Sequence, residues 1–290
     1  MNDIIFPMKV HAVKLEYRRL MLENMPHGHF AVKKGVWNVV ITYDPDQPKY
    51  NTRYPRTLYV SSKLGRKYTE IINNYLKIKS EYELLLASWK SLYNVAPPRI
   101  RFPIKQFSDP HGMNNDFFNR QSEHCGKYIP DNPTESEFGE LKSKNELMGA
   151  DILKLMDIPF KYETKVTFVE TNETINPDYL INFYEIDRCA YLEILGMNDK
   201  GDYSMRTASK INGFSRSGYR PGREVIYVLL YDKANFDRDY FVSQVLSAFN
   251  DMIPDSALVW DTKPVYSIKA PSSDESWGNP TLGDSTAPAC

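Results

Sequence analysis

The sequence predicts a mixed α/β fold of the α+β kind, in which a sheet flanked by helices follows a small β-rich module and a long amphipathic helix. Two patterns predict it. Between residues 68 and 93, apolar side chains recur at alternating steps of four and three, which is the spacing of one helix face. Between residues 143 and 250, the periods of helices and strands follow one another in the order helix, three strands, helix, strand, helix.

The composition is that of a protein with a sizeable core in one or two domains, since the 290 residues are 42% hydrophobic and 25% charged. A mean hydropathy of -0.50 and the lack of a long apolar run exclude an integral membrane protein. The first 17 residues carry charges among their apolar residues, so they do not predict a secretory signal. The three cysteines are far apart, which excludes a disulfide framework or a Cys-x-x-Cys zinc pair, and we expect a cytoplasmic protein.

The N-terminal part divides into two predicted elements. Residues 1–61 are rich in Val, Ile, Tyr and Trp, most clearly at Val36 to Tyr43, and predict a small β-rich module. Residues 62–95 predict one long amphipathic helix, which ends before Pro97 and Pro98. Its apolar seam must be covered either by this chain or, in a homodimer or with a partner protein, by another one. The seam consists of Ile71, Tyr75, Ile78, Tyr82, Leu85, Trp89 and Leu92.

Three further segments follow along the chain. Residues 96–133 are rich in Asn, Gly, Pro and Asp and predict a loop or linker, whose histidines and asparagines are a weak match to a His-Asn-His nuclease site. Residues 134–268 contain the alternating helical and strand patterns and form the predicted main domain. Residues 269–290 are dominated by Pro, Ser, Gly, Asp and Thr and predict a disordered tail.

In the main domain, acidic residues stand at three structurally distinct positions. Ser143 and Glu146 match a capping box at the start of a helix, although Glu146 shares a helix face with apolar residues further along. Asp178 follows Pro177 at the start of a predicted strand. Glu193 lies in the middle of the next strand among apolar neighbours, where an ionised carboxylate is unfavourable unless it is paired or binds a cation.

The net charge of -1 conceals a strong asymmetry along the chain. Residues 49–105 hold 12 Lys or Arg and three Glu, a balance of +9, whereas residues 134–203 hold seven basic and 15 acidic residues, a balance of -8. Residues 205–223 contain five basic residues and no acidic one. An acidic centre between basic stretches suits a metal site beside phosphate-binding surfaces, although solvated charged faces would give the same counts.

Three motifs in this order resemble the PD-(D/E)XK nuclease superfamily, which has a restriction-endonuclease-like fold. They are Ser143-Lys144-Asn145-Glu146, Pro177-Asp178, and Tyr191-Leu192-Glu193-Ile194-Leu195-Gly196-Met197. The resemblance covers about a third of the chain, with a vaguer likeness of the N-terminal part to proteins of mobile elements. It implies a curved mixed sheet on which Glu146, Asp178, Glu193 and the carbonyl of Ile194 bind Mg²⁺ or Mn²⁺, and a metal-dependent endodeoxyribonuclease activity.

The sequence departs from the family pattern at Leu195, where a lysine is expected two residues after Glu193. Lys144 and Lys210 are the candidates to replace that catalytic cation, and we favour Lys210, which lies in the basic stretch 17 residues after Glu193. If neither does, the protein is a nuclease-like DNA-binding or assembly module that does not cut; in a third reading, the carboxylates are only capping and surface groups of an unrelated α/β protein. Strandedness, DNA versus RNA, and biological role stay open, because backbone contacts carry no base information. The predicted nucleic-acid contacts are Arg206, Arg216, Arg220, Arg223, Arg66 and Lys67.

Overall fold

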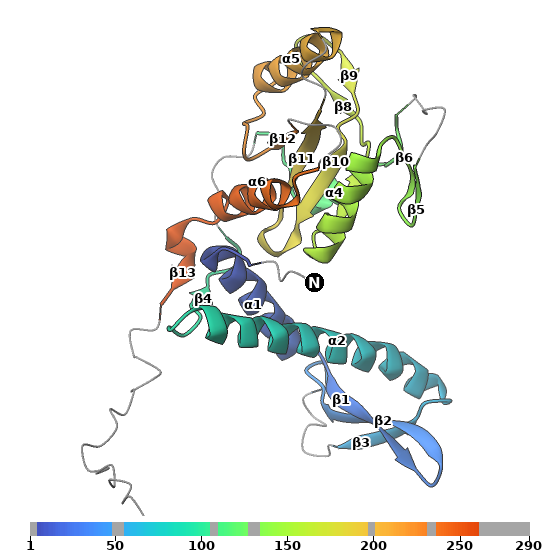
Figure 1. The fold of residues 1–290 in the computed structure, drawn as a ribbon. Helices are drawn as coiled ribbons and strands as arrows, with labels where there is room; N and C mark the ends of the chain where they lie inside the picture. The colour runs from blue at the N-terminus through green and yellow to red at the C-terminus, as the bar shows by residue number, and fades with distance from the viewer. Residues whose placement is uncertain are drawn as a thin grey trace, which may run out of the picture.

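A computed structural model describes residues 5–47, 55–104, 110–126, 134–196, 201–230 and 236–260. Figure 1 shows two parts: a sheet domain, and a long helix that carries a small sheet away from it. The predicted disordered tail at 269–290 and Met197 of the third motif lie outside the described residues. Within the described part, no helix combines the length and apolar character that crossing a membrane requires. The mixed α+β fold class is confirmed.

The sheet domain is built on a four-stranded sheet in the order β12-β11-β10-β7, in which β7, β10 and β11 are antiparallel and β12 is parallel to β11. The predicted order from residue 143 onward is confirmed for its helices and its last strand. The first two of the three predicted strands are each divided, so that the described residues form five strands between the first two helices, of which β7, β10 and β11 belong to this sheet. The main elements are α4 (Lys144–Leu155), β7 (Phe160–Tyr162), β10 (Tyr179–Phe183), β11 (Arg188–Leu195), α5 (Gly201–Arg216), β12 (Val225–Leu229) and α6 (Arg238–Asp251).

Helices cover both faces of this sheet. One face packs on α4 and α6, with the buried helix residues Ala150, Leu153, Phe241 and Phe249 in the main core. The other face packs on α5 through Phe214 and on the short helix α3 (Asn115–Arg120). The strands are buried on both sides because alternate side chains enter the two cores, which explains their nearly continuous apolar sequences.

Smaller strands complete the domain. The predicted strand after Pro159 is interrupted at Glu163, which has a left-handed backbone conformation with φ 47°, so that β7 ends there and β8 starts afresh. Strand β8 pairs with β9 as an antiparallel hairpin, which turns around Asn172. The remaining strands are β4 (Arg99–Ile100), β5 (Thr134–Ser136), β6 (Gly139–Leu141), β8 (Val166–Thr167), β9 (Thr174–Ile175) and β13 (Leu258–Val259). Strands β4 and β13 pair, as do β5 and β6.

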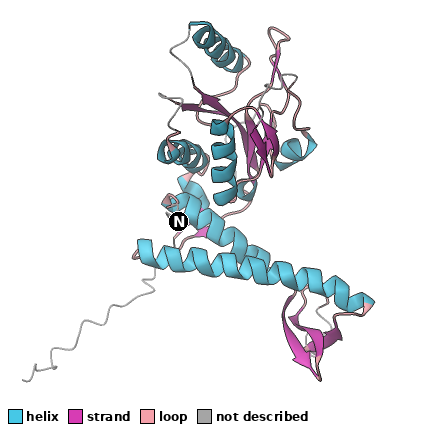
Figure 2. Cartoon of the chain, turned by 45° about the vertical axis from the view of Figure 1, so that its right-hand side comes forward, coloured by secondary structure: helices cyan, strands magenta, loops and turns pink. Residues whose placement is uncertain are grey.

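The predicted long helix is confirmed as α2 (Lys63–Leu92), which starts at a Ser62 cap and crosses the lower half of the molecule in Figures 1 and 2. At its N-terminal end it carries the three-stranded antiparallel sheet β1 (His27–Lys33), β2 (Val36–Tyr43) and β3 (Arg56–Tyr59). This sheet and the beginning of α2 share a separate small core.

The prediction of a β-rich module for residues 1–61 is wrong at its start, because Met8–Glu23 form the helix α1. The helix escaped the sequence pattern because nearly every residue of its middle is buried, including His11, Lys14 and Glu16. No amphipathic period results from such a run. Helix α1 packs against the C-terminal half of α2 and shares the main core of the sheet domain with Trp89 of α2.

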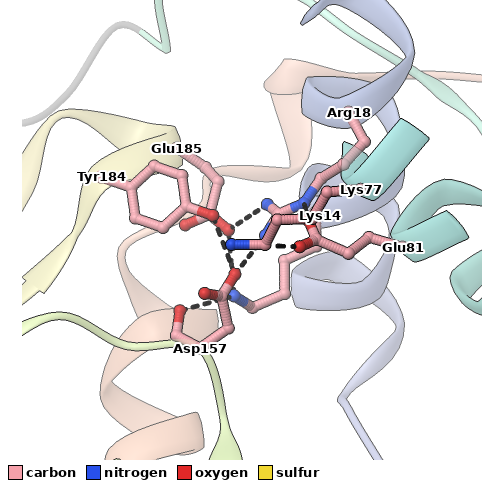
Figure 3. Close-up of polar contacts among 7 residues, drawn as sticks. All are labelled: Lys14, Arg18, Lys77, Glu81, Asp157, Tyr184 and Glu185. Atoms are coloured by element: carbon pink, nitrogen blue, oxygen red, sulfur yellow. Dashed lines mark hydrogen bonds and ion pairs between the residues drawn. The ribbon is translucent and has the colours of Figure 1, made fainter. Parts of the chain in front are cut away.

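A buried ion cluster fastens α1 to the sheet domain (Figure 3). Glu185 accepts hydrogen bonds from Lys14 at 2.9 Å and from Arg18 at 2.8 Å, and the side chains of all three are almost fully buried. Arg18 also pairs with Asp157 and, at 3.5 Å, with Glu81 of α2. The cluster therefore joins three parts of the chain that are far apart in sequence.

The helix seam packs within this chain. Ile78 and Trp89 are buried, and α1 and the strands β1 and β2 lie against α2. Of the seam residues, Leu92 is exposed by 42% of its surface. Of the two alternatives that the sequence left open, the structure therefore shows the first for most of this face: it is covered by the protein's own α1 and small sheet, and a second copy or a partner protein at the seam stays untested.

Candidate active site

The strand pairing brings two of the predicted acidic residues side by side. Tyr179 of β10 pairs with Leu192 of β11, so Asp178, one residue earlier, lies across from Glu193, one residue later. Asp178 also accepts a hydrogen bond from the amide of Ile194, with 2.6 Å between the nitrogen and Oδ2. The backbone next to Glu193 therefore holds the Asp178 carboxylate in place.

Glu193 is a buried carboxylate with only part of its hydrogen-bonding capacity used. Its side chain is 1% exposed, and Oε2 accepts a hydrogen bond from Nζ of Lys210 at 2.8 Å. Oε1 is buried and has no hydrogen-bond partner among the described residues. An unpartnered buried carboxylate oxygen is unfavourable by itself, so this oxygen is a candidate to bind a ligand.

The pKa values of both Asp178 and Glu193 are raised. Burial, together with the neighbouring charges of Glu193 and Glu146, raises the pKa of Asp178 well above its ordinary value against the opposing effect of Lys210. Burial also raises the pKa of Glu193, although Lys210 opposes it; Glu146 and Glu163 add to the rise. One lysine does not neutralise this group, and a divalent cation would stabilise its ionised form.

Glu146 lies close enough to influence both carboxylates, but its own side chain is bound locally. Its oxygens accept hydrogen bonds from the amide of Lys142 at 2.9 Å, from the hydroxyl of Ser143 at 3.0 Å and from the hydroxyl of Tyr162 at 2.5 Å. Ser143 in turn caps the helix by accepting from the amide of Glu146. The predicted capping role is confirmed in this geometry.

The donor chemistry suits a hard divalent cation, and two residues carry the fit. Asp178 and Glu193 supply adjacent carboxylate oxygens, one of them buried without a partner. Among the described residues, no group of three or more His, Cys, Asp or Glu side chains is arranged to hold a metal ion. Glu146 would join Asp178 and Glu193 as a ligand only by leaving its cap, and the role of the Ile194 carbonyl stays a prediction.

The two candidate lysines differ in position. Lys210 of α5 contacts Glu193 directly, as the sequence interpretation favoured. Lys144 is exposed on the first turn of α4. Lys142, which lies between β6 and α4, forms an ion pair with Glu163.

Glu163 and Tyr162 are site residues that the sequence reasoning missed. Glu163 is 7% exposed, adds to the electrostatic field at Glu193 and has its amide bonded to the carbonyl of Asp178 at 3.1 Å. Tyr162 supports Glu146 through its hydroxyl. The available signal was the loss of strand alternation directly after Tyr162. It coincides with Glu163 itself, whose backbone has a left-handed conformation.

Two predicted nucleic-acid contacts lie on the same helix as Lys210. Arg206 is exposed and precedes Lys210 by one helical turn, so both project from the same side of α5. Arg216 is exposed at the end of that helix, where its Nε lies 3.2 Å from a carboxylate oxygen of Glu170.

The other predicted contacts lie elsewhere. Arg220 is paired with Glu224, and Arg223 lines a small cleft beside it. Arg66 and Lys67 are exposed near the start of α2, at the end of the molecule that carries the small sheet. They do not belong to the acidic group.

The histidines and the asparagine of the weak His-Asn-His match have structural contacts. His111 stacks on Tyr219 with ring centroids 3.8 Å apart, Asn114 caps α3, and His124 packs against Tyr162. These contacts account for the side chains without a catalytic function.

Comparison of the chain with protein-family models, curated proteins and solved structures finds no match. The candidate site therefore stands on the geometry of this chain and on its three motifs.

Proposed function

We propose that this protein is a metal-dependent nuclease that hydrolyses phosphodiester bonds of DNA. The observation that carries the proposal is the pair Asp178 and Glu193: adjacent carboxylates with raised pKa values, one of which keeps a buried oxygen without a partner. Strongly perturbed, clustered carboxylates are typical of functional sites rather than of ordinary ion pairs.

Asp178 and Glu193 would hold Mg²⁺ or Mn²⁺, and such an ion activates water and neutralises charge on a phosphate. Lys210 holds the orientation of Glu193 through its 2.8 Å contact and supplies the positive charge that Leu195 cannot. The amide of Ile194 fixes Asp178, while Tyr162 keeps Glu146 beside the pair. These residues preorganise the acidic group before a cation or DNA arrives.

The arrangement of the sheet also supports the proposal. The motif residues come from the start of α4, the residue before β10 and the middle of β11, and the strands β10 and β11 are neighbours. A curved mixed sheet with this origin of the acidic residues is what the resemblance to PD-(D/E)XK nucleases implies. The exposed Arg206 on α5 gives a phosphate a basic contact one turn from Lys210.

The test is cleavage of supercoiled, linear and single-stranded DNA with Mg²⁺, with Mn²⁺ or with EDTA. The wild-type protein is compared with Asp178→Ala and Glu193→Ala, and Glu173→Ala, an exposed carboxylate of the same domain, is the matched control. The proposal expects cutting that requires the metal, disappears in both site variants and persists in the control. Cutting that survives in both site variants would refute it.

A second candidate is a nuclease-like protein that binds DNA or assembles with other proteins without cutting. Two observations favour it: leucine at position 195 and the engagement of Glu146 by its helix cap. Binding of DNA without any cleavage under the metal conditions above would select this candidate.

A further inference from the structure

The small sheet and the beginning of α2 form an arm that stands apart from the sheet domain (Figures 1 and 2). We define the arm as β1, β2, β3 and residues 63–76 of α2. Its core is small, because it consists of the buried side chains Val39, Ile41, Tyr68 and Ile72 and a few partly buried neighbours.

Large apolar side chains are exposed on this arm. Trp37 is 61% exposed and Tyr59 62% exposed, and Val32, which pairs with Trp37 across the β1–β2 hairpin, is 54% exposed. The hairpin turns at Lys34 and Gly35, both with positive φ, so its two strands are connected tightly and hold Val32 and Trp37 near the tip, whereas Tyr59 lies on the neighbouring strand β3. Exposed aromatic groups on a projecting ribbon indicate a contact surface.

The charge of the same surface selects the class of partner. The stretches 32–37 and 56–67 contain six Lys or Arg residues and no Asp or Glu. All six basic side chains are exposed; four of them stand three or four residues from Trp37 or Tyr59 in sequence, and the other two lie near the start of α2. They are Lys33, Lys34, Arg56, Lys63, Arg66 and Lys67. Cations interleaved with aromatic side chains are the pattern of a nucleic-acid surface.

We propose that the arm binds duplex DNA, with its cations on the phosphates and the hairpin tip at a groove. A groove of B-form DNA accommodates a two-stranded ribbon, and lysines and arginines on both sides of it would contact the two phosphate chains. This inference deepens the proposed nuclease function, on which it rests for the choice of DNA as the partner.

The arm would contact DNA at a distance from the acidic group. Helix α2 has 30 residues, so at 1.5 Å per residue it is about 45 Å long, and the arm occupies the end opposite α1. The arm therefore contributes affinity without touching the bond that is cut. Its loss weakens binding but leaves the cutting rate at saturating DNA unchanged.

The experiment measures binding of the full chain to a fluorescent duplex of about 30 base pairs, which spans roughly 100 Å. EDTA is present so that no cutting occurs. The test variant is Lys34→Ala/Arg66→Ala/Lys67→Ala, and the inference expects binding at least tenfold weaker near 0.1 M salt. If the three side chains contact phosphates, the slope of log affinity against log salt should decrease by about two to three.

The matched control is Lys77→Ala/Lys79→Ala/Lys90→Ala, which removes the same charge from exposed positions of α2 outside the arm. It should bind within about twofold of the wild type. A second pair separates the aromatic contribution: Trp37→Ala should weaken binding severalfold, whereas Leu84→Ala, an equally exposed apolar residue of α2, should not. Thermal unfolding of each variant checks that these exposed substitutions leave the fold intact.

The outcomes distinguish this inference from the proposed function. The arm inference is overturned if the arm variant binds as tightly as the charge-matched control, if wild type binds no duplex DNA, or if only single-stranded DNA is bound. Loss of binding in the arm variant supports it even when the wild type cuts nothing, in which case the proposed function alone fails.

Discussion

Two buried glutamates eight residues apart in sequence differ in the partners that surround them. Glu185 and Glu193 are both 1% exposed at their side chains. Glu185 accepts hydrogen bonds from Lys14 and Arg18, in a cluster that also includes Asp157 (Figure 3). Glu193 has one basic partner, Lys210, and keeps a buried oxygen for which the described residues supply no donor.

The difference separates a structural ion cluster from the site that we propose binds a divalent cation. Around Glu185 the acidic charges raise the pKa of Arg18 further, although burial opposes the rise, so the cluster is held in its charged form. Around Glu193, burial raises the pKa of the carboxyl group, Lys210 opposes the rise, and the neighbouring acidic residues add to it. Among the described residues, the first arrangement pairs its carboxylate with two cations, whereas the second pairs Glu193 with Lys210 and leaves one of its oxygens without a donor.

The largest expected effect is on catalysis. Glu193→Gln and Asp178→Asn should reduce metal-dependent cleavage on the order of 10³-fold or more, because each removes a charged oxygen ligand. Neither should lower the melting temperature of the metal-free protein, since both relieve repulsion between the two adjacent carboxylates. Single-turnover cleavage and thermal unfolding measure the two effects. Unfolding of both variants at normal assay temperature would make these residues structural and break the comparison.

The next effect is on stability. Glu185→Gln should lower the free energy of unfolding by about 3–5 kcal/mol, because it leaves Lys14 and Arg18 buried without their shared carboxylate. Denaturant unfolding measures the loss. The control Glu23→Gln removes an exposed pair with Arg19 and should change stability by less than about 1 kcal/mol. Equal effects of the two substitutions would show that the Glu185 cluster does not fasten α1.

A smaller effect distinguishes the two lysines. Lys210→Met should slow cleavage by about 10²-fold, since it removes the cation that contacts Glu193. Lys210→Arg should restore part of the rate. Lys144→Met, at an exposed position, should leave the rate unchanged. If Lys144→Met is the slower enzyme, the assignment of the auxiliary cation must be reversed.

The smallest effect is a pH dependence of stability in the metal-free protein. A carboxyl group whose pKa is raised by folding binds its proton more tightly in the native state, so its stabilising contribution is present at low pH and is lost as pH rises through the folded pKa. The advantage of Asp178→Asn over wild type should therefore grow as pH rises above about 4, by at most about 1.4 kcal/mol per unit of pKa shift. Unfolding curves in EDTA across pH 4 to pH 8 measure it; a constant difference would contradict the raised pKa.

Much of the sheet domain could be predicted from the sequence because its strands and helices are continuous periodic segments. The order of elements from α4 to α6 followed from that periodicity, and Glu193 stood out because it interrupts an apolar strand. The contact of Lys210 with Glu193 followed from its position after that strand only as a preference between two lysines.

The rest depends on contacts between distant segments. Helix α1 was missed because Lys14 and Arg18 are buried by pairing with residues more than 100 positions away, which no local pattern reveals. Glu163 was missed because its own left-handed backbone conformation decides where its side chain lies. The attachment of Glu146 to its cap depends on Tyr162, another residue brought in by the tertiary fold.

The most direct test of the central claim, that Asp178 and Glu193 hold a divalent cation, is isothermal titration of Mn²⁺ into the metal-free protein. Wild type and Glu173→Gln should show saturable binding, whereas Asp178→Asn and Glu193→Gln should lose it. Equal Mn²⁺ binding by all four proteins, or none by the wild type, would contradict the claim and leave the acidic pair without its proposed role.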